Sequence, residues 1–186
     1  CFLVMDGREG YGKSTLAAQI AKYLDPSYNV DRCCFTPKQF AQAVAKAEKY
    51  QAIVFDETFG ALGSRSTMSK FNRLLTQLMT EMRFKNLIVI LCIPSFFELG
   101  KYPAIHRSNG LVHVYKRGCA MLVPYDTKKI MYIKGKKEYD YKMVKRPLRF
   151  RFVKEFPIDK EAYNKKKLQS SSVESNELLE ETTKKS

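Results

Sequence analysis

Short apolar runs and longer amphipathic segments alternate along the first 115 residues. The apolar runs have the character of buried strands, and they cover residues 1–5, 29–35, 52–55, 87–93 and 111–115. Between them, apolar side chains recur at helical spacing over residues 15–24, 37–50 and 68–82. Because strands that alternate with helices join into a parallel sheet, this pattern predicts an α/β fold.

Local signals refine this outline at two places. Thr36 has the character of a helix N-cap, with Pro37 at the first helical position and Gln39 completing a capping box. After Cys119 the rhythm changes to short apolar segments between lysine-rich turns, at 119–123, 130–133 and 148–153. These segments predict a β appendage on the sheet edge, and residues 157–168 predict a basic helix that follows it.

Three regions are therefore expected along the chain. Residues 1–117 form an α/β core, and residues 118–168 form a basic, β-rich appendage with a terminal helix. The tail 169–186 is rich in Ser, Glu and Thr, and its low apolar content predicts disorder.

The segment between the first strand and the first helix carries the main chemical signal. It reads Gly-Arg-Glu-Gly-Tyr-Gly-Lys-Ser over residues 7–14, which is a complete G-x-x-x-x-G-K-S loop. Glycines let successive backbone N–H groups point at phosphate oxygens, and the helix N-terminus adds partial positive charge. A chance glycine-rich turn is the alternative, and the strand and helix around the loop disfavour it. The residues expected to bind the nucleotide are Gly7, Arg8, Glu9, Gly10, Tyr11, Gly12, Lys13, Ser14 and Thr15.

Within this loop, Lys13 is expected to reach the β- and γ-phosphates, and the Ser14 hydroxyl to ligate Mg²⁺. A second acidic signal lies at the end of the strand 52–55, where Asp56 and Glu57 follow each other. Asp56 is expected to hold Mg²⁺ through water, and Glu57 to polarise a water molecule for in-line attack on the γ-phosphate. A carboxylate that acts on water favours hydrolysis over phosphoryl transfer to a metabolite.

The loop 7–14 together with Asp56 and Glu57 resembles the Walker A and Walker B pair of P-loop NTPases with an added catalytic glutamate. This branch includes the AAA+, RecA-like and FtsK/HerA-type motors, and the likeness is closest to FtsK/HerA-like and Zot-like ATPases of viruses and plasmids. The resemblance covers about residues 1–117. It implies ATP and Mg²⁺ as ligands, and a three-layer fold with a mainly parallel sheet of order 5-1-4-3-2.

The same resemblance implies further site residues and an oligomer. An arginine finger would come from a neighbouring subunit of a ring or other homo-oligomer. Arg107 occupies the place used in AAA+ proteins, and Arg83 is its rival. Ser95, after the strand 87–93, is the best match to the polar sensor residue. An ordinary surface role remains an alternative for both arginines.

Charge is distributed unevenly along the chain, whose net charge is +14. Residues 101–168 carry 19 basic and 6 acidic side chains, a balance of +13, with tyrosines interleaved among the lysines. Such a block suggests a polyanionic partner, and nucleic acid is the expected one. The alternative is that the basic side chains form a solvated face and the tyrosines lie on amphipathic strands.

Composition sets the remaining expectations. The five cysteines show no metal-ligand spacing, which is typical of reduced thiols in a cytosolic protein. No apolar run has the length of a membrane span, and no signal peptide is visible. We therefore expect a cytoplasmic protein (in the host cytoplasm if viral) that hydrolyses ATP to drive nucleic-acid translocation or packaging. A small-molecule or nucleotide kinase and a Zot-like assembly ATPase are the alternatives.

Overall fold

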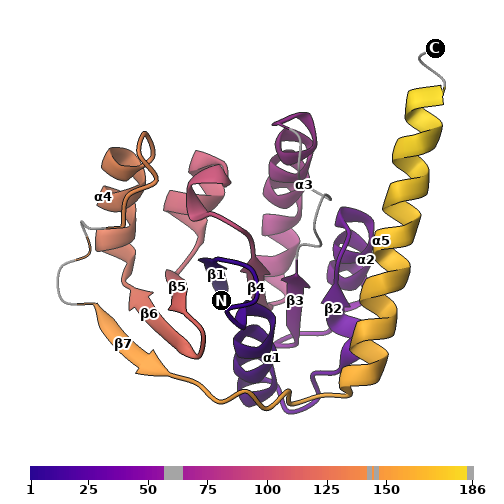
Figure 1. Ribbon diagram of the computed structural model, residues 1–186, viewed down its shortest axis with the longest axis horizontal. Helices are drawn as coiled ribbons and strands as arrows, with labels where there is room; N and C mark the ends of the chain where they lie inside the picture. The colour runs from indigo at the N-terminus through magenta and orange to yellow at the C-terminus, as the bar shows by residue number, and fades with distance from the viewer. Residues whose placement is uncertain (57–64, 142–143, 145–146, 184–186) are drawn as a thin grey trace.

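A seven-stranded sheet forms the centre of the computed structural model, which describes residues 1–56, 65–141, 144 and 147–183 (Figure 1). The spatial order is β2-β3-β4-β1-β5-β6-β7; the first five strands in this order are parallel, and β6 pairs antiparallel with both β5 and β7. The strands are β1 (Phe2–Gly7), β2 (Cys33–Cys34), β3 (Ala52–Asp56), β4 (Ile88–Cys92), β5 (Gly110–Lys116), β6 (Cys119–Val123) and β7 (Leu148–Arg151).

The mixed α/β class is confirmed, but the strand order of the whole sheet differs from the expected 5-1-4-3-2. The expected order has five strands and ends at β5, whereas the sheet continues past β5 through β6 and β7. The hairpin from β5 to β6 and the pairing of β6 with β7 make these strands part of the same sheet. The strand β4 lies between β1 and β3, so the ends of β1 and β3 flank it at the carboxyl edge.

Helices cover both faces of this sheet and bury two separate hydrophobic clusters. One cluster contains apolar side chains of α1 and the start of α5, and the other contains those of α2, α3 and α4. The helices are α1 (Lys13–Leu24), α2 (Pro37–Lys46), α3 (Arg65–Phe84), α4 (Tyr125–Gly135) and α5 (Lys160–Thr183), with short helices η1 (Val30–Arg32), η2 (Phe96–Glu98) and η3 (Tyr102–Arg107).

The helix start predicted at Thr36 is confirmed. The Thr36 hydroxyl accepts a hydrogen bond from the backbone N–H of Gln39 at 3.2 Å, and Pro37 is the first residue of α2. The Gln39 side chain accepts a hydrogen bond from the backbone N–H of Phe35 at 2.9 Å. Two backbone donors at the helix entry are thus satisfied by side chains only a few residues away.

Three segments differ from the sequence predictions. The predicted strand 130–133 lies in α4, where Met131 and Tyr132 are buried while Ile130 and Ile133 are exposed. Four consecutive apolar residues fit a strand and a helix equally well, and in the structure they form part of a helix. The run 29–35 forms η1 and the two-residue β2. The tail from 169 was expected to be disordered, but α5 continues through it to Thr183.

An extended strap connects β7 at one edge of the sheet to the last helix, α5, at the other edge. Residues 152–159 leave β7, pass beside α1, and enter α5 next to β2 and α2 (Figure 1). The Gln19 side chain of α1 donates hydrogen bonds to the backbone oxygens of Val153 and Glu155, at 3.0 and 2.7 Å. The strap therefore brings the C-terminal part of the chain to the first helix.

Candidate nucleotide-binding site

The loop between β1 and α1 depends on glycine at two positions. Gly7 has φ of 134°, and a Cβ there would lie 2.3 Å from the backbone oxygen of Val114. Gly12 has φ of 97°, and a Cβ there would lie 3.0 Å from the Phe152 ring. Both positions combine a left-handed backbone with a close neighbour, so any other residue would displace the loop.

Lys13 begins α1 and folds back over the loop. Its Nζ donates hydrogen bonds to the backbone oxygens of Gly7 and Arg8, at 2.5 and 3.2 Å. The ammonium group therefore lies inside the curve of the loop, where a helix N-terminus also supplies partial positive charge. This arrangement is suited to an anionic group of the size of a phosphate.

The loop opens onto a cavity of about 580 Å³ at the carboxyl edge of the sheet. This cavity gathers most of the predicted nucleotide-binding and metal-binding residues, together with side chains of β4, the β5–β6 hairpin, the strap and α5. The predicted residues that line it are Glu9, Gly10, Tyr11, Gly12, Lys13, Ser14, Thr15 and Asp56. Gly7 and Arg8 line a neighbouring cavity of about 690 Å³, together with Ser95.

Asp56 is the last residue of β3 and is buried, with 3% of its surface exposed. Its Oδ2 accepts a hydrogen bond from the hydroxyl of Tyr163 and one from Nζ of Lys167, the latter at 3.1 Å. Both donors belong to α5, so the C-terminal helix reaches the carboxylate that the sequence assigned to metal binding.

Tyr163 also contacts the second predicted metal ligand. Its hydroxyl donates a hydrogen bond to Asp56, and the Ser14 side chain lies beside that hydroxyl. Burial and the nearby charge of Asp56 raise the pKa of Tyr163 well above its usual value, so the hydroxyl keeps its proton at neutral pH.

The donor set at this point fits Mg²⁺. Ser14 and Asp56 line the same cavity, and both lie beside the Tyr163 hydroxyl, so their oxygens can contribute to one cation site. In the described ranges no group of three or more His, Cys, Asp or Glu side chains could hold a metal ion. A magnesium ion with one or two protein ligands takes its remaining oxygens from phosphate and water, as this set requires.

Of the other predicted catalytic residues, the structure describes Arg107, which does not line this cavity. Glu57 lies outside the described residues. Arg107 donates a hydrogen bond from Nη2 to the backbone oxygen of Met79 at 3.0 Å, and it lines a cavity with Arg83 at the amino edge of the strands. The two candidate fingers therefore lie side by side on the edge opposite the loop, and a role in a neighbouring subunit stays a prediction.

A positively charged wall on the cavity was missed at the sequence level. Arg117 lies in the β5–β6 hairpin, Lys154 lies in the strap, and Lys160 and Lys167 lie on α5. The excess of basic residues in 101–168 was the available signal, and it was assigned to a polyanionic partner. The structure shows that part of this excess faces the loop 7–14.

A second buried carboxylate fixes the strand that enters the loop. Asp6 is fully buried, and it accepts a hydrogen bond from the backbone N–H of Phe96 at 2.9 Å. Nδ1 of His113 lies 2.8 Å from Asp6 Oδ1, and the Tyr141 hydroxyl donates to Oδ2. The rings of His113 and Tyr141 stack with centroids 4.0 Å apart. These contacts hold the end of β1 against β5 and η2, directly before Gly7.

Comparison with known proteins adds a family. The family model described as novel STAND NTPase 3 matches residues 1–98, which is more than half of the chain and includes the loop 7–14 and Asp56. No curated protein and no solved structure matches the chain. Among the described residues, no helix is both long enough and apolar enough to cross a membrane.

Proposed function

Since the chain belongs to the novel STAND NTPase 3 family, we propose that it binds a nucleoside triphosphate with Mg²⁺ at the loop 7–14 and hydrolyses it. The observation that carries this proposal is the cavity in which Lys13, Ser14 and Asp56 meet. A cation-binding carboxylate, a hydroxyl and a phosphate-binding ammonium are the groups that phosphoryl transfer from a nucleotide requires.

In this proposal the loop and the cationic wall hold the phosphate chain. Backbone N–H groups of the loop and the Lys13 ammonium bind phosphate oxygens at the N-terminus of α1. Arg117, Lys154 and Lys160 border the same cavity and favour an extended polyanion over a single phosphate. We assign the triphosphate on this basis, with ATP as the first candidate.

The bound Mg²⁺ would neutralise charge on the phosphate oxygens. Ser14 and Asp56 are the residues that would hold it, and Asp56 is suited to this because its carboxylate is buried at the end of β3. Glu57 follows directly in the sequence, and we propose that it orients the attacking water.

Release of free phosphate with Mg²⁺ tests this function. We expect hydrolysis of ATP by the wild type and a loss of about 100-fold or more in kcat/KM for Lys13→Ala, because one preorganised donor to a charged oxygen is removed. Lys38→Ala is the matched control, since Lys38 is an exposed lysine on α2 and should leave the rate unchanged. An equal rate in Lys13→Ala would contradict the proposal, and phosphate transfer to a nucleoside with little free phosphate would favour a kinase.

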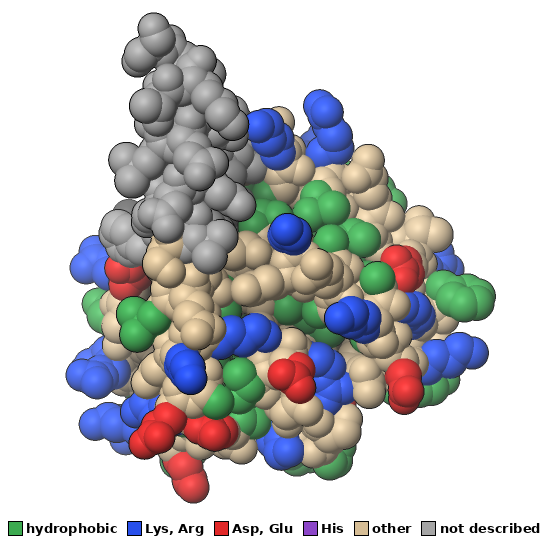
Figure 2. Space-filling model, turned by 90° about the vertical axis from the view of Figure 1, so that its right-hand side faces the viewer, with side chains coloured by type: hydrophobic (Ala, Val, Ile, Leu, Met, Phe, Trp, Pro, Cys, Tyr) green, Lys and Arg blue, Asp and Glu red, His purple; other side chains and the backbone are tan. Residues whose placement is uncertain are grey.

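We further propose, as a finer form of this function, that nucleic acid is the partner of the basic surface. This proposal is supported by the net charge of +13 in residues 101–168. Some of these basic side chains are buried or line the cavity, so fewer are left for a nucleic acid. Lys128 is buried and donates to backbone oxygens of η3, and Arg117, Lys154 and Lys160 line the cavity. On the face that includes α5, Lys and Arg are interspersed with Asp and Glu (Figure 2).

Stimulation of hydrolysis by DNA or RNA tests this finer form. A motor coupled to nucleic acid should hydrolyse ATP faster when polymer is added at low salt, and the gain should fall as salt rises. A rate that polymer leaves unchanged at low salt would overturn the translocation proposal and leave the NTPase intact. A rate per protomer that rises steeply with protein concentration would support an oligomer with Arg107 or Arg83 acting in trans.

A further inference from the structure

Side chains of the last helix lie at the two residues that are suited to Mg²⁺, Ser14 and Asp56. The Tyr163 hydroxyl donates a hydrogen bond to Asp56, and the Ser14 side chain lies beside the same hydroxyl. Lys167, one helical turn later, places its ammonium 3.1 Å from the same Asp56 oxygen. A polar hydrogen and a positive charge therefore meet the carboxylate where a cation held by the same oxygens would lie.

The start of α5 is held in place by contacts of its own. Asp159 caps the helix, accepting hydrogen bonds from the backbone N–H groups of Glu161 and Ala162 at 3.0 Å each. The Tyr163 ring packs edge-on against Phe35 at 5.2 Å and lies 4.7 Å from the Phe156 ring. Only 6% of Tyr163 is exposed, so its hydroxyl cannot turn away without movement of the helix.

Further along, α5 is bound to the sheet edge by polar groups. Nζ of Lys166 donates to the backbone oxygens of Val30 and Asp31, at 2.9 and 3.0 Å. The Gln39 amide donates to the Ser170 hydroxyl at 2.8 Å. Polar contacts of this kind exchange readily for contacts with water, so this part of the helix can separate from the sheet at a small cost in free energy.

We propose that α5 and the magnesium-bound nucleotide compete for Ser14 and Asp56, so that binding of the loaded nucleotide releases α5 from the sheet edge. The inference rests on the proposed function and deepens it. Because one position cannot hold the tyrosine hydroxyl and a metal ion together, binding of one weakens binding of the other by the same factor. The released helix is then the signal that reports the state of the nucleotide site.

Hydrogen exchange of the wild-type chain provides a direct test. We expect faster amide exchange in residues 160–172 when Mg²⁺ and a non-hydrolysable ATP analogue are added together. The analogue with EDTA should leave the exchange of α5 unchanged, because Ser14 and Asp56 then keep their contacts with Tyr163. Bound analogue and Mg²⁺ with unchanged or slower exchange in α5 would overturn the inference and leave the NTPase function standing.

A double variant tests the same competition through affinity. Tyr163→Phe with Lys167→Met keeps the ring and the aliphatic stem but removes the hydroxyl and the ammonium. We expect roughly tenfold tighter binding of the analogue with Mg²⁺, because two contacts to a buried carboxylate no longer oppose the metal. Lys165→Met is the matched control, since Lys165 is an exposed lysine on the same helix.

The outcomes separate the inference from the function on which it rests. Binding that is equal in the double variant and the wild type would overturn the competition alone. Binding that is detected only in the double variant would support the competition strongly. Failure of both proteins to bind any nucleotide would overturn the NTPase function and the inference with it.

Discussion

Two buried aspartates, Asp25 and Asp56, lie at opposite ends of β3, and they differ in the groups that donate hydrogen bonds to them. Asp25 follows α1 and contacts Ala52, the first residue of β3, whereas Asp56 is the last residue of that strand. They are similarly buried, with 7% and 3% of their surfaces exposed. Burial alone therefore does not distinguish a structural carboxylate from one that serves a ligand.

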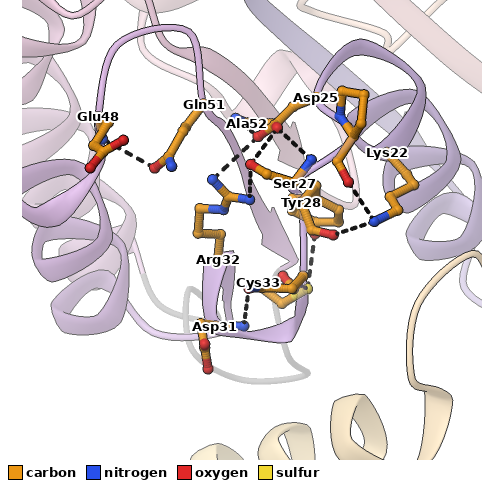
Figure 3. Close-up of polar contacts among 12 residues, drawn as sticks. Lys22, Asp25, Ser27, Tyr28, Asp31, Arg32, Cys33, Glu48, Gln51 and Ala52 are labelled. Atoms are coloured by element: carbon orange, nitrogen blue, oxygen red, sulfur yellow. Dashed lines mark hydrogen bonds and ion pairs between the residues drawn. The ribbon is translucent and has the colours of Figure 1, made fainter.

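The partners of Asp25 come from the segment that follows α1 and from the backbone of β3 (Figure 3). Its Oδ1 accepts hydrogen bonds from the backbone N–H and the hydroxyl of Ser27, at 2.9 and 2.6 Å. Its Oδ2 accepts one from the backbone N–H of Ala52 at 2.8 Å and lies 3.3 Å from Nη1 of Arg32. These contacts connect the end of α1 to the start of β3. Both oxygens of Asp25 already have hydrogen-bond partners that a ligand would have to displace.

Asp56 instead takes its hydrogen bonds from two side chains of a helix 107 and 111 residues further along the chain. The side chains of a helix can move away from the carboxylate when the helix moves, whereas a backbone N–H of a central strand is fixed by the sheet. The two carboxylates thus differ in the origin of their partners and not in their depth of burial, which supports the proposal that Asp56 binds Mg²⁺.

The largest effect on stability is expected for Asp25→Ala. This change leaves the Arg32 guanidinium buried without its ion pair and the Ala52 N–H without an acceptor, and it should lower the free energy of unfolding by about 3–5 kcal/mol. Urea unfolding measures it, with Asp31→Ala as the control because Asp31 is exposed. A loss below about 1 kcal/mol would show that the Asp25 contacts are dispensable, against the structural role assigned to them.

Asp56→Asn should give the opposite profile. The amide keeps an oxygen for Tyr163, so the free energy of unfolding should change by less than about 1 kcal/mol, whereas hydrolysis should fall on the order of 100-fold or more. Phosphate release and urea unfolding on the same preparation measure the two quantities. Full activity in this variant, or a large loss of stability without loss of activity, would contradict the assignment of a structural role to Asp25 and a functional role to Asp56.

The smallest effect concerns the pH dependence of stability. Burial alone raises the pKa of Asp25, but hydrogen bonds from Ser27 and Ala52, together with Arg32, outweigh it and hold the pKa below its usual value. A lowered pKa in the folded state stabilises the fold above the unfolded value of about 4, and this contribution is lost as the pH falls through the folded value. Asp25→Asn should therefore lose less stability than the wild type between about pH 6 and pH 3. Parallel stability curves for the two proteins would contradict this assignment.

The loop and the cap of α2 could be predicted because their chemistry is local. Gly7, Gly12 and Lys13 lie within seven consecutive positions, and Thr36 and Gln39 lie within four, so the chain itself brings them together. The parallel core likewise follows from the alternation of strands and helices.

The contacts of α5 with Asp56 and the helical form of residues 130–133 depend on tertiary packing, which the spacing of residues along the chain does not encode. Tyr163 and Lys167 reach Asp56 only because the strap carries the chain past α1 to the far edge of the sheet. The run 130–133 is apolar at every position and therefore has no period, and its helical form is decided by the packing of Met131 and Tyr132. In both cases tertiary contacts decide what the local sequence pattern leaves open.

Calorimetric titration with a non-hydrolysable ATP analogue, with and without Mg²⁺, is the direct test of the role proposed for Asp56. We predict that Mg²⁺ tightens binding to the wild type and to Asp25→Asn, and that Asp56→Asn loses this dependence on the metal while it still binds the phosphates through Lys13. Binding to Asp56→Asn that shows the same dependence on Mg²⁺ as the wild type would contradict the role of Asp56 as a magnesium ligand.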